Sequence, residues 1–405
     1  MGTSSSPDIG EKIWFEVHHI ARKLRETTST HSIPEGCGMP QYRAAVIGLG
    51  RMGSTFDDEI TQGGSIFLPY CHAPSYVAAP NVELVAGSDI HKEQGEIFGA
   101  RWGLEDGHVY TDYREMLEKE RPDLLSVCTT ARVRAEIVIE AARAGVKAIW
   151  AEKPIAFSLQ EADEMVRVCD SEGTKLAVNC ARRWNPFFAE ARRMIDEGEF
   201  GRILQITGYG QCGLSHNGSH LIDILRYMAG GEVQWVFGEM ESDEAAGGES
   251  DLMGNGYLAF DNGVRTYLRG MPCGSANWEI DVVCEHGRFK SCENSQGPEL
   301  YRLVEGGPRG RRVQAKVPFP YPARVQGTGL TIVDDLISSV EDDHDPRCSG
   351  RDGLAALEIA IALRASHRGG GVRIDLPLED RSLKIQSQET FQDDVPARVR
   401  REMAR

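Results

Sequence analysis

A lysine follows an apolar stretch of the chain at a place where it could move a proton. The run from Val146 to Ala151 predicts a buried strand, and Glu152, Lys153 and Pro154 come directly after it. In open parallel sheets, ligands bind at the carboxyl ends of the strands. A lysine there can hold or donate the proton that moves opposite a hydride. An ordinary solvated lysine is the alternative at this position.

A glycine-rich turn earlier in the chain predicts a dinucleotide beside that lysine. Residues 44–53 read Ala-Ala-Val-Ile-Gly-Leu-Gly-Arg-Met-Gly, which is a buried strand followed by GxGxxG. This spacing lets backbone amides approach a pyrophosphate, although the pattern by itself is weak. The predicted cofactor contacts in this turn are Gly48, Gly50, Arg51, Met52 and Gly53.

Asp89 strengthens the dinucleotide prediction and bears on the choice of cofactor. The second predicted strand ends in Gly87-Ser88-Asp89, and an acidic residue at this place can bind both ribose hydroxyls of the adenosine half. Its charge would repel a 2′-phosphate, which favours NAD over NADP. His91 and Lys92 stand close enough to weaken that preference, so NADP stays the alternative. A surface-turn aspartate is the simpler interpretation of Asp89 alone.

The spacing after the glycine-rich turn departs from the simplest fingerprint. About a dozen extra residues separate Gly53 from the second strand, and the excess falls at residues 54–70. We interpret this segment as a loop near the cofactor that helps to shape the substrate pocket. A tolerated surface insertion is an equally fair interpretation.

Four motifs in the same order make the chain resemble the glucose-fructose oxidoreductase, inositol dehydrogenase and rhizopine-catabolism (Gfo/Idh/MocA) family. They are GLGRMG at 48–53, Asp89 after the second strand, AEKPIA at 151–156 and HLID at 220–223. The similarity extends over approximately residues 42–377. It implies NAD-dependent hydride transfer between the nicotinamide and a hydroxyl or carbonyl carbon of a sugar, sugar derivative or cyclitol.

The resemblance assigns catalysis to two residues. In the family, the lysine of EKP and the histidine of HxxD flank the nicotinamide and the reacting carbon, which carries over to Lys153 and His220. Asp223 matches the partner aspartate, and Thr129 and Glu152 join the cofactor contacts. Three residues apart at a predicted helix start, His220 and Asp223 can face one side, and a histidine titrates near neutrality. A lone histidine would by itself favour a structural role.

Two positions depart from the family's pattern. The family often has an aspartate four residues before the histidine, whereas this chain has His216 followed by Asn217, so the proton relay is expected to differ. Arg134 stands after the fourth strand, where the family commonly has a histidine. It is either a helix-surface charge or a contact for a substrate that bears a carboxylate or several hydroxyls.

A further stretch resembles the family's segment that enters the substrate pocket. It is Arg-Arg-Trp-Asn-Pro at 182–186, in which Trp184 offers a flat face for a sugar ring and Arg183 a fork of donors. A buried tryptophan that packs a domain interface is about as fair an interpretation. No metal site is predicted, and the substrate candidates are Lys153, Arg183, Trp184, His216, Asn217, His220 and Asp223.

The mechanism implied by the resemblance has two rivals. NAD is expected to lie across the sheet with its nicotinamide facing the second domain, where His220, assisted by Lys153, takes a hydroxyl proton. One rival is a redox-neutral NAD-dependent glycosidase, which oxidises its substrate transiently and reduces it again. The other is a non-catalytic NAD-binding regulator, against which the intact Lys153 and His220 count.

The predicted elements place these residues in an α/β protein of two domains. An alternation of strands and helices gives an N-terminal Rossmann doubly wound parallel sheet, with strands Ala44–Ile47, Val82–Ala86, Leu124–Cys128 and Ala148–Ala151 and a helix at Arg134–Ala144. Successive strands then give a C-terminal α+β domain with a large, mainly antiparallel sheet, from Ile203–Gly208, Val264–Leu268, Trp278–Val283 and Arg288–Cys292. Two late helices and a last strand follow at Thr331–Val340, Gly353–His367 and Val372–Leu376.

These elements predict the borders of the domains. We expect an N-terminal extension at 1–40, the NAD-binding domain at 41–155, the substrate-binding and oligomerisation domain at 156–385 and a polar tail at 386–405. The late helices could pack back on the first domain. The extension is either an oligomer arm or a loose tail.

Composition narrows the partners. A net charge of −16 without a long basic block disfavours nucleic acid and anionic membranes, and no run is apolar enough to span a bilayer. The ten cysteines are scattered without a metal-binding spacing, and Cys128 and Cys180 have no recognisable base beside them. We therefore expect a cytoplasmic enzyme for a small molecule, which forms a homodimer or homotetramer through the exposed face of its larger sheet.

Overall fold

The computed structural model describes residues 42–60, 67–105, 107–275, 278–291, 297–322 and 325–386. The predicted N-terminal extension, nearly all of the predicted polar tail and the centre of the 54–70 segment lie outside these residues. The chain divides into two compact units, of which the first comprises Met1–Cys128, Arg143–Trp150 and Arg324–His344. The second comprises Thr129–Ala142, Ala151–Ala323 and Asp345–Arg405. The domain borders at residues 155 and 385 stay predictions.

The N-terminal strands form a six-stranded sheet of the predicted Rossmann type. Its order is β3-β2-β1-β4-β5-β6, and β1 pairs in parallel with both β2 and β4. β1 is almost wholly buried because both faces of such a sheet are covered. The strands are β1 (Tyr42–Ile47), β2 (Val82–Ser88), β3 (Val109–Tyr110), β4 (Leu124–Val127), β5 (Ala148–Ala151) and β6 (Lys175–Val178).

The helices that alternate with these strands begin and end at residues suited to those places. Asp112 accepts a hydrogen bond from a backbone amide in the first turn of α4, and Ser158 and Glu161 form a capping box on α6. Gly173 ends α6 in the left-handed conformation that glycine adopts without strain. The helices are α2 (His72–Ala78), α3 (Lys92–Trp102), α4 (Tyr113–Glu120), α5 (Ala131–Arg143) and α6 (Leu159–Glu172).

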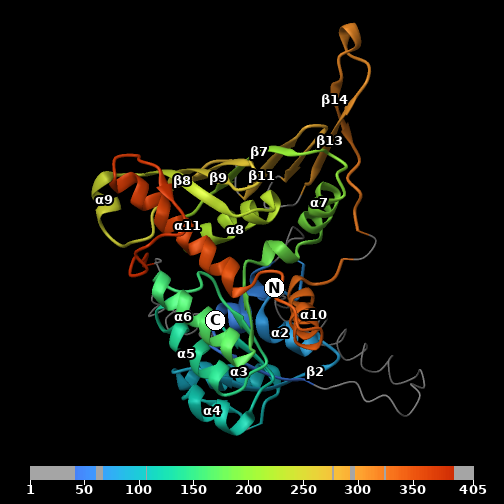
Figure 1. The fold of residues 1–405 in the computed structure, drawn as a ribbon. Coiled ribbons are helices and arrows are strands. Elements are labelled where there is room, and N and C mark those ends of the chain that lie inside the picture. The colour runs from blue at the N-terminus through green and yellow to red at the C-terminus, as the bar shows by residue number, and fades with distance from the viewer. Residues whose placement is uncertain are drawn as a thin grey trace, which may run out of the picture. The chain divides into compact units, whose positions relative to one another are not determined.

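Nine later strands form the second sheet, in the order β14-β13-β12-β11-β7-β10-β9-β8-β15 (Figure 1). Most neighbouring pairs are antiparallel and β7 with β10 is parallel, which confirms the predicted mainly antiparallel sheet. The strands are β7 (Ile203–Gly210), β8 (Val233–Met240), β9 (Gly254–Phe260), β10 (Arg265–Gly270), β11 (Glu279–Cys284), β12 (Gly287–Ser291), β13 (Glu299–Val304), β14 (Val313–Val317) and β15 (Ile374–Asp375).

Two helices cover one face of this second sheet (Figure 1). They are α8 (Gly218–Ala229), nearly all of whose residues are buried, and α11 (Gly350–Arg368). α11 approaches β8 so closely that a Cβ atom on Gly238 would lie 2.2 Å from the carbonyl oxygen of Leu363. The opposite face carries exposed aromatic side chains. Two further helices, α7 (Pro186–Asp196) and α9 (Asp243–Gly247), follow β6 and β8 in the chain.

A late helix returns the chain to the first compact unit. α10 (Thr328–Glu341) belongs to that unit, whereas α11 belongs to the second. Gly329 lets α10 approach α2, because a Cβ atom at this position would meet the Ser75 hydroxyl at 1.8 Å. The Tyr42 hydroxyl donates a hydrogen bond to Glu341 at 3.0 Å, which ties the end of α10 to the first strand.

Candidate active site

The glycine-rich turn has the geometry of a phosphate cradle. β1 ends at Ile47, and Gly48 follows with φ of 85°, a conformation that favours glycine. A Cβ atom on Gly53 would lie 2.2 Å from the carbonyl oxygen of Gly48, so only glycine fits there. Gly50 precedes a short helical turn, Arg51–Thr55, whose first amides are oriented for an anion. These residues fit a dinucleotide pyrophosphate.

Asp89 is fixed beside this turn. Its carboxylate accepts hydrogen bonds from the amides of Leu49 at 2.9 Å and His91 at 3.0 Å. Each carboxylate oxygen has a second lone pair, so the group can also accept from ribose hydroxyls. Of the other predicted cofactor contacts in the turn, Met52 is half-buried and the exposed Arg51 pairs with Glu59 at 2.6 Å.

Arg134 is buried in the structure and is not a surface charge. It is 2% exposed, and its guanidinium donates to the carbonyl oxygens of Thr129 and Pro154. The interpretation of this arginine as a surface charge is therefore wrong, and the interpretation as a substrate contact stays a prediction. Its physical role is to clamp the turn after β4 to the segment that carries Lys153. The hydroxyl of Thr129 is buried and has no hydrogen-bond partner among the described residues.

Lys153 follows β5 directly, at the carboxyl edge of the parallel sheet. Its ammonium donates a hydrogen bond to the Asn217 side-chain oxygen at 2.8 Å, and burial lowers the pKa of this lysine from its ordinary value. Glu152 beside it is 5% exposed and accepts a 2.6 Å hydrogen bond from the Asn179 amide.

The segment before α8 presents Asn217 and His216 from a rigid turn. Asp251 is buried and accepts hydrogen bonds from the amides of Ser215 and His216, each at 2.8 Å. Asn217 precedes the first turn of α8 but makes no capping bond, because its oxygen faces Lys153 instead. Burial, together with the charge of Lys153, lowers the pKa of His216 to about 4. The histidine that replaces the usual aspartate is therefore neutral at neutral pH.

His220 lies in the first turn of α8 and is 8% exposed. Its Nδ1 atom has no hydrogen-bond partner among the described residues. Burial lowers the pKa of His220 well below its ordinary value, and the cations Arg182 and Lys153 lower it further. The ring meets that of Trp278 edge-on, with 5.9 Å between centroids. A neutral imidazole of this kind can accept a proton.

Asp223 is bound by an arginine. Both of its oxygens accept hydrogen bonds from Arg183, at 2.8–3.0 Å, and Arg183 also pairs with Asp352 at 2.9 Å. Arg183 and Trp184 are only 8% and 2% exposed. The structure therefore places Arg183 and Asp223 in a buried ion-pair network and Trp184 in the core, and their contact with a substrate stays a prediction.

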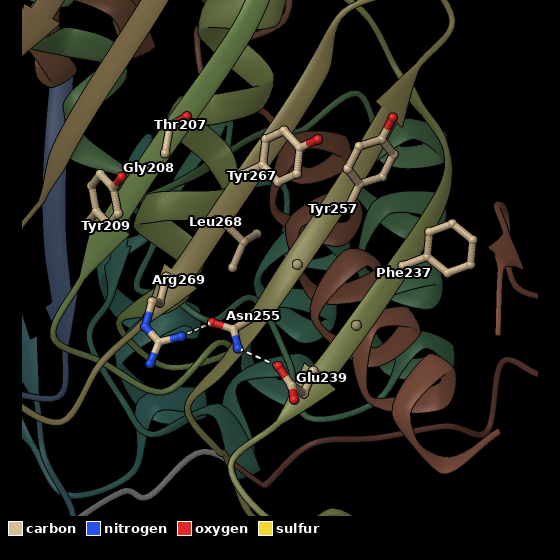
Figure 2. A pocket seen from close by; sticks show the side chains of 12 residues that line it. Thr207, Gly208, Tyr209, Phe237, Glu239, Asn255, Tyr257, Tyr267, Leu268 and Arg269 are labelled. Atoms are coloured by element: carbon tan, nitrogen blue, oxygen red, sulfur yellow. Dashed lines mark hydrogen bonds between the residues drawn. The ribbon is translucent and has the colours of Figure 1, made fainter. Parts of the chain in front are cut away.

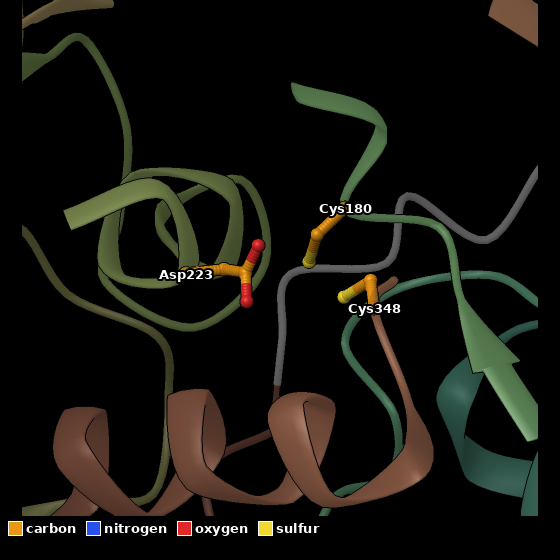
Figure 3. A group of neighbouring side chains, drawn as sticks. All are labelled: Cys180, Asp223 and Cys348. Atoms are coloured by element: carbon orange, nitrogen blue, oxygen red, sulfur yellow. The ribbon is translucent and has the colours of Figure 1, made fainter. Parts of the chain in front are cut away.

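Two cysteines lie beside this network (Figure 3). The ligand atoms of Cys180, Asp223 and Cys348 all lie within 4.8 Å of one another. Arg183 already occupies both oxygens of Asp223 and would repel a cation. Burial raises the pKa of Cys348 well above its ordinary value, which disfavours the thiolate that binds metals. We interpret the cluster as packing.

Two residues near His220 were missed in the sequence. Arg182 stacks on Trp278, with its guanidinium carbon 4.2 Å from the ring centroid. Arg182 begins the predicted pocket stretch at 182–186 but was not selected as a site residue, and Trp278 is distant in sequence from every predicted site residue. The only available signal was that Arg182 is adjacent to Arg183. The sequence does not show which of two neighbouring side chains points inward.

Comparisons with known proteins identify the family. The sequence model of the Gfo/Idh/MocA oxidoreductase family, NAD-binding Rossmann fold, matches residues 42–180. The model of the C-terminal alpha/beta domain of the same family matches residues 208–376. The chain belongs to this oxidoreductase family. This confirms the resemblance, the Rossmann fold and the NAD cofactor predicted from the sequence.

Relatives with established names fit this assignment. D-apiose dehydrogenase of Paraburkholderia graminis is 26% identical over 76% of this chain and 87% of its own length. Myo-inositol 2-dehydrogenase of Thermotoga maritima is 25% identical over 80% of this chain and 96% of its own. The solved aldose-aldose oxidoreductase of Caulobacter crescentus has a TM-score of 0.69 at 19% identity, and covers 83% of this chain and 100% of its own. That likeness concerns the fold.

The structure also bears on the membrane prediction. Among the described residues, no helix combines the length and the apolar character needed to cross a bilayer. The cytoplasmic location stays a prediction.

Proposed function

We propose that the protein transfers hydride between NAD and a hydroxyl-bearing or carbonyl carbon of a sugar, sugar derivative or cyclitol. The observation that carries this proposal is a cluster of three residues. Lys153, which follows β5, bonds Asn217, and a neutral, buried His220 lies close enough for Lys153 to lower its pKa. The chain that holds this cluster belongs to an NAD-binding oxidoreductase family. The D-apiose and myo-inositol dehydrogenase activities of the named relatives support the substrate class.

The chain's own residues divide the work of proton transfer. NAD, when bound at the glycine-rich turn and Asp89, supplies the hydride acceptor. His220 is neutral and can take the substrate hydroxyl proton, since its pKa lies well below neutrality. Lys153, fixed by Asn217, holds a positive charge that stabilises negative charge developing on the substrate oxygen. Asp223 supports this site indirectly, because its bonds to Arg183 fix α8.

Two alternatives predict different products. A redox-neutral glycosidase would cleave a glycoside without net NADH, and a regulator would bind NAD without turnover. We favour the dehydrogenase because both proton-transfer candidates are present, with a half-buried Lys153 after β5 and a buried His220 on α8, and because the named relatives are dehydrogenases.

The decisive experiment compares NAD binding and NADH formation in matched lysine variants. Wild-type protein should bind NAD and form NADH with at least one substrate in a panel of cyclitols, aldoses and glycosides. Lys153→Ala should lower kcat by about 100- to 10,000-fold while the Kd for NAD changes little. Lys119→Ala is the control, because Lys119 lies exposed on α4 and pairs with Glu115. Unchanged turnover in Lys153→Ala would refute its role.

We also infer that two copies of the chain associate through the open face of the nine-stranded sheet (Figure 2). Phe237 and Tyr267 are 39% and 44% exposed on this face and lie around a hollow of about 420 Å³. A line of three hydrogen-bonded side chains, positive at one end and negative at the other, crosses this hollow. Arg269 donates to Asn255 and Asn255 donates to Glu239, each at 2.8 Å. A two-fold axis pairs such a face with itself, so opposite charges can meet.

A further inference from the structure

A hairpin with an arginine-rich tip projects from one edge of the nine-stranded sheet. It joins β13 to β14, the last strand at that edge, and it rises beyond the sheet on the side away from α8 and α11 (Figure 1). The tip carries three exposed arginines, Arg309, Arg311 and Arg312. None of the three forms an ion pair with a residue that the structure describes, and Arg312 donates only to the Leu303 carbonyl oxygen, at 3.0 Å. We call residues 299–317 the arginine hairpin.

Hydrogen bonds within the loop fix the tip of the arginine hairpin. The Gly307 amide donates to the Arg311 carbonyl oxygen at 2.9 Å, and the Arg311 amide donates to the Pro308 carbonyl oxygen at 3.3 Å. Gly306 and Gly310 have φ of 133° and 72°, which glycine adopts without strain. The arginines are therefore presented from a defined loop, so that less conformational entropy is lost when a partner binds them.

An acidic segment lies at the opposite corner of the same sheet. It follows β8, near the other edge, and includes α9. β8 and β13 run in opposite directions, because five of the six pairings that link them are antiparallel. The carboxyl ends of these two strands therefore lie at opposite ends of the sheet as well as near opposite edges.

The carboxylates of this corner are exposed. They belong to Glu241, Asp243 and Glu244, which we call the acidic corner. Asp243 lies 2.9 Å from the His367 ring, whereas Glu241 and Glu244 have no ion-pair partner in the part of the chain that the structure describes. One sheet thus carries three exposed cations at one corner and three exposed anions at the opposite corner.

This arrangement of charge is self-complementary in a two-fold pair. Each contact in such a pair occurs twice, with the two partners exchanged. A two-fold axis that crosses the line between the corners at right angles places each arginine hairpin against the acidic corner of the other copy. An axis along that line would instead place arginines against arginines, which repel one another.

We propose that the arginine hairpin of each copy binds the acidic corner of a second copy of this chain. The proposal rests on the open-face pairing of two copies proposed above and adds to it a contact at the corners, whereas it does not depend on hydride transfer. Arginine binds carboxylates through two parallel hydrogen bonds, and the three arginines match the three carboxylates in number. A nucleic acid fits this protein less well, because a net charge of −16 repels a polyanion.

Reversing the charge of the acidic corner separates this contact from general repulsion between copies. The acidic-corner variant carries Glu241→Arg, Asp243→Arg and Glu244→Arg. Each replacement adds two positive charges, so the net charge changes from −16 to −10 and general repulsion falls. The proposed contact predicts the opposite result, a dissociation constant of the pair that rises by at least about 30-fold. Sedimentation velocity over a range of concentrations measures this constant.

A matched variant on the first compact unit provides the control. It carries the same change of charge at exposed positions on α3 and α4, as Glu93→Arg, Glu96→Arg and Glu118→Arg. Association of this variant should be at least as strong as that of the wild-type protein, because its net charge also falls in magnitude and the corners are untouched.

Mixing two variants identifies the surface to which the arginine hairpin binds. The hairpin variant carries Arg309→Glu, Arg311→Glu and Arg312→Glu. Alone, it should associate as weakly as the acidic-corner variant, because like charges meet at both corners of each pair. An equimolar mixture of the two variants should form heterodimers, because both contacts in the mixed pair join opposite charges. Association in the mixture would also show that both variants are folded.

The outcomes distinguish the corner contact from the open-face pairing. If both variants associate as the wild-type protein does, or if their mixture associates no better than each alone, the corner contact is overturned. Open-face pairing survives that result when Phe237→Glu with Tyr267→Glu dissociates the pair. A wild-type protein that stays monomeric overturns both, as does binding of the hairpin to heparin without any self-association. Formation of NADH tests hydride transfer separately from all of these results.

Discussion

At the scale of single residues, the site relies on histidines kept neutral by their surroundings. His216 and His220 lie near the cations Lys153 and Arg182, and burial adds to the effect of these charges. Each histidine titrates below its ordinary pKa of 6.5 as a result. A histidine whose pKa is lowered stays a neutral proton acceptor until the pH falls through that lowered pKa.

The pH dependence of catalysis should reflect this depression. We expect kcat/KM to hold at pH 6 and to fall only as the pH drops well below 6.5, where His220 begins to take up a proton. A profile of kcat/KM from pH 4.5 to 9 measures this, with protein stability checked at each pH. An acid limb at or above pH 6.5 would contradict the assignment of His220 as the acceptor.

Asn217 gives a related prediction. Asn217→Asp places a carboxylate 2.8 Å from the Lys153 ammonium, in place of a neutral amide oxygen. The new charge should raise the pKa of Lys153 and of the neighbouring histidines, so the acid limb of kcat/KM should move to higher pH by about one unit. The conservative variant Asn217→Ser, which adds no charge, should leave the limb in place. Identical profiles for both variants would argue against electrostatic control of the relay.

At the scale of elements, α8 and α11 are joined by buried charge. Arg183 bonds Asp223 of α8 and Asp352 of α11, and Arg226 reaches Asp352 from α8 at 3.1 Å. Side-chain exposure is 10% for Arg183 and 0% for Asp223. Such a network fixes how the two helices sit against each other, because removal of one partner leaves another charge buried.

Loss of Arg183 should therefore act on stability. Arg183→Ala and Asp223→Ala should each destabilise the protein by about 3–5 kcal/mol, and the double variant by less than the sum. Arg167→Ala, which removes an exposed pair with Glu164, should cost at most about 0.5 kcal/mol. Urea midpoints followed by circular dichroism would measure these changes. A cost for Arg183→Ala as small as that of Arg167→Ala would contradict the buried-network interpretation.

The contact between α11 and β8 should tolerate no added side chain. Gly238→Ala would bring a methyl group within 2.2 Å of the Leu363 carbonyl oxygen, so the helix would have to move. We expect destabilisation of about 1–3 kcal/mol, as for other overpacked contacts. Gly247→Ala serves as the control, since a Cβ atom there meets nothing within 4 Å. Thermal denaturation of both variants would show whether the close approach is required.

Local signals made much of this arrangement predictable. Three parts of the site follow apolar strands directly, so the pattern of apolar residues in the sequence locates them. They are the glycine turn, Asp89 and Lys153. The predicted strands correspond to β1, β2, β4 and β5, whereas β3 has only two residues and too little pattern to be seen. The roles of Arg134 and Trp278 depend on contacts between residues distant in sequence, which no local pattern contains.

At the scale of the whole molecule, the open sheet face predicts self-association. Tyr267→Glu together with Phe237→Glu places two charges on an aromatic surface and should convert the oligomer into a smaller species. Val133→Glu, at a position 42% exposed on α5, should leave the oligomer intact. Sedimentation velocity at several protein concentrations would distinguish them. A wild-type protein that sediments as a monomer at micromolar concentration would reject the interface.

The return of α10 to the first compact unit has a consequence for biosynthesis. α10 ends at Glu341, near the end of the chain, yet it packs against α2 and is tied to Tyr42. During translation, the early part of this unit leaves the ribosome long before its last helix does. The nucleotide-binding unit therefore cannot complete its core until most of the second unit has been synthesised. Until then, the surface of α2 that α10 covers stays exposed in the nascent chain.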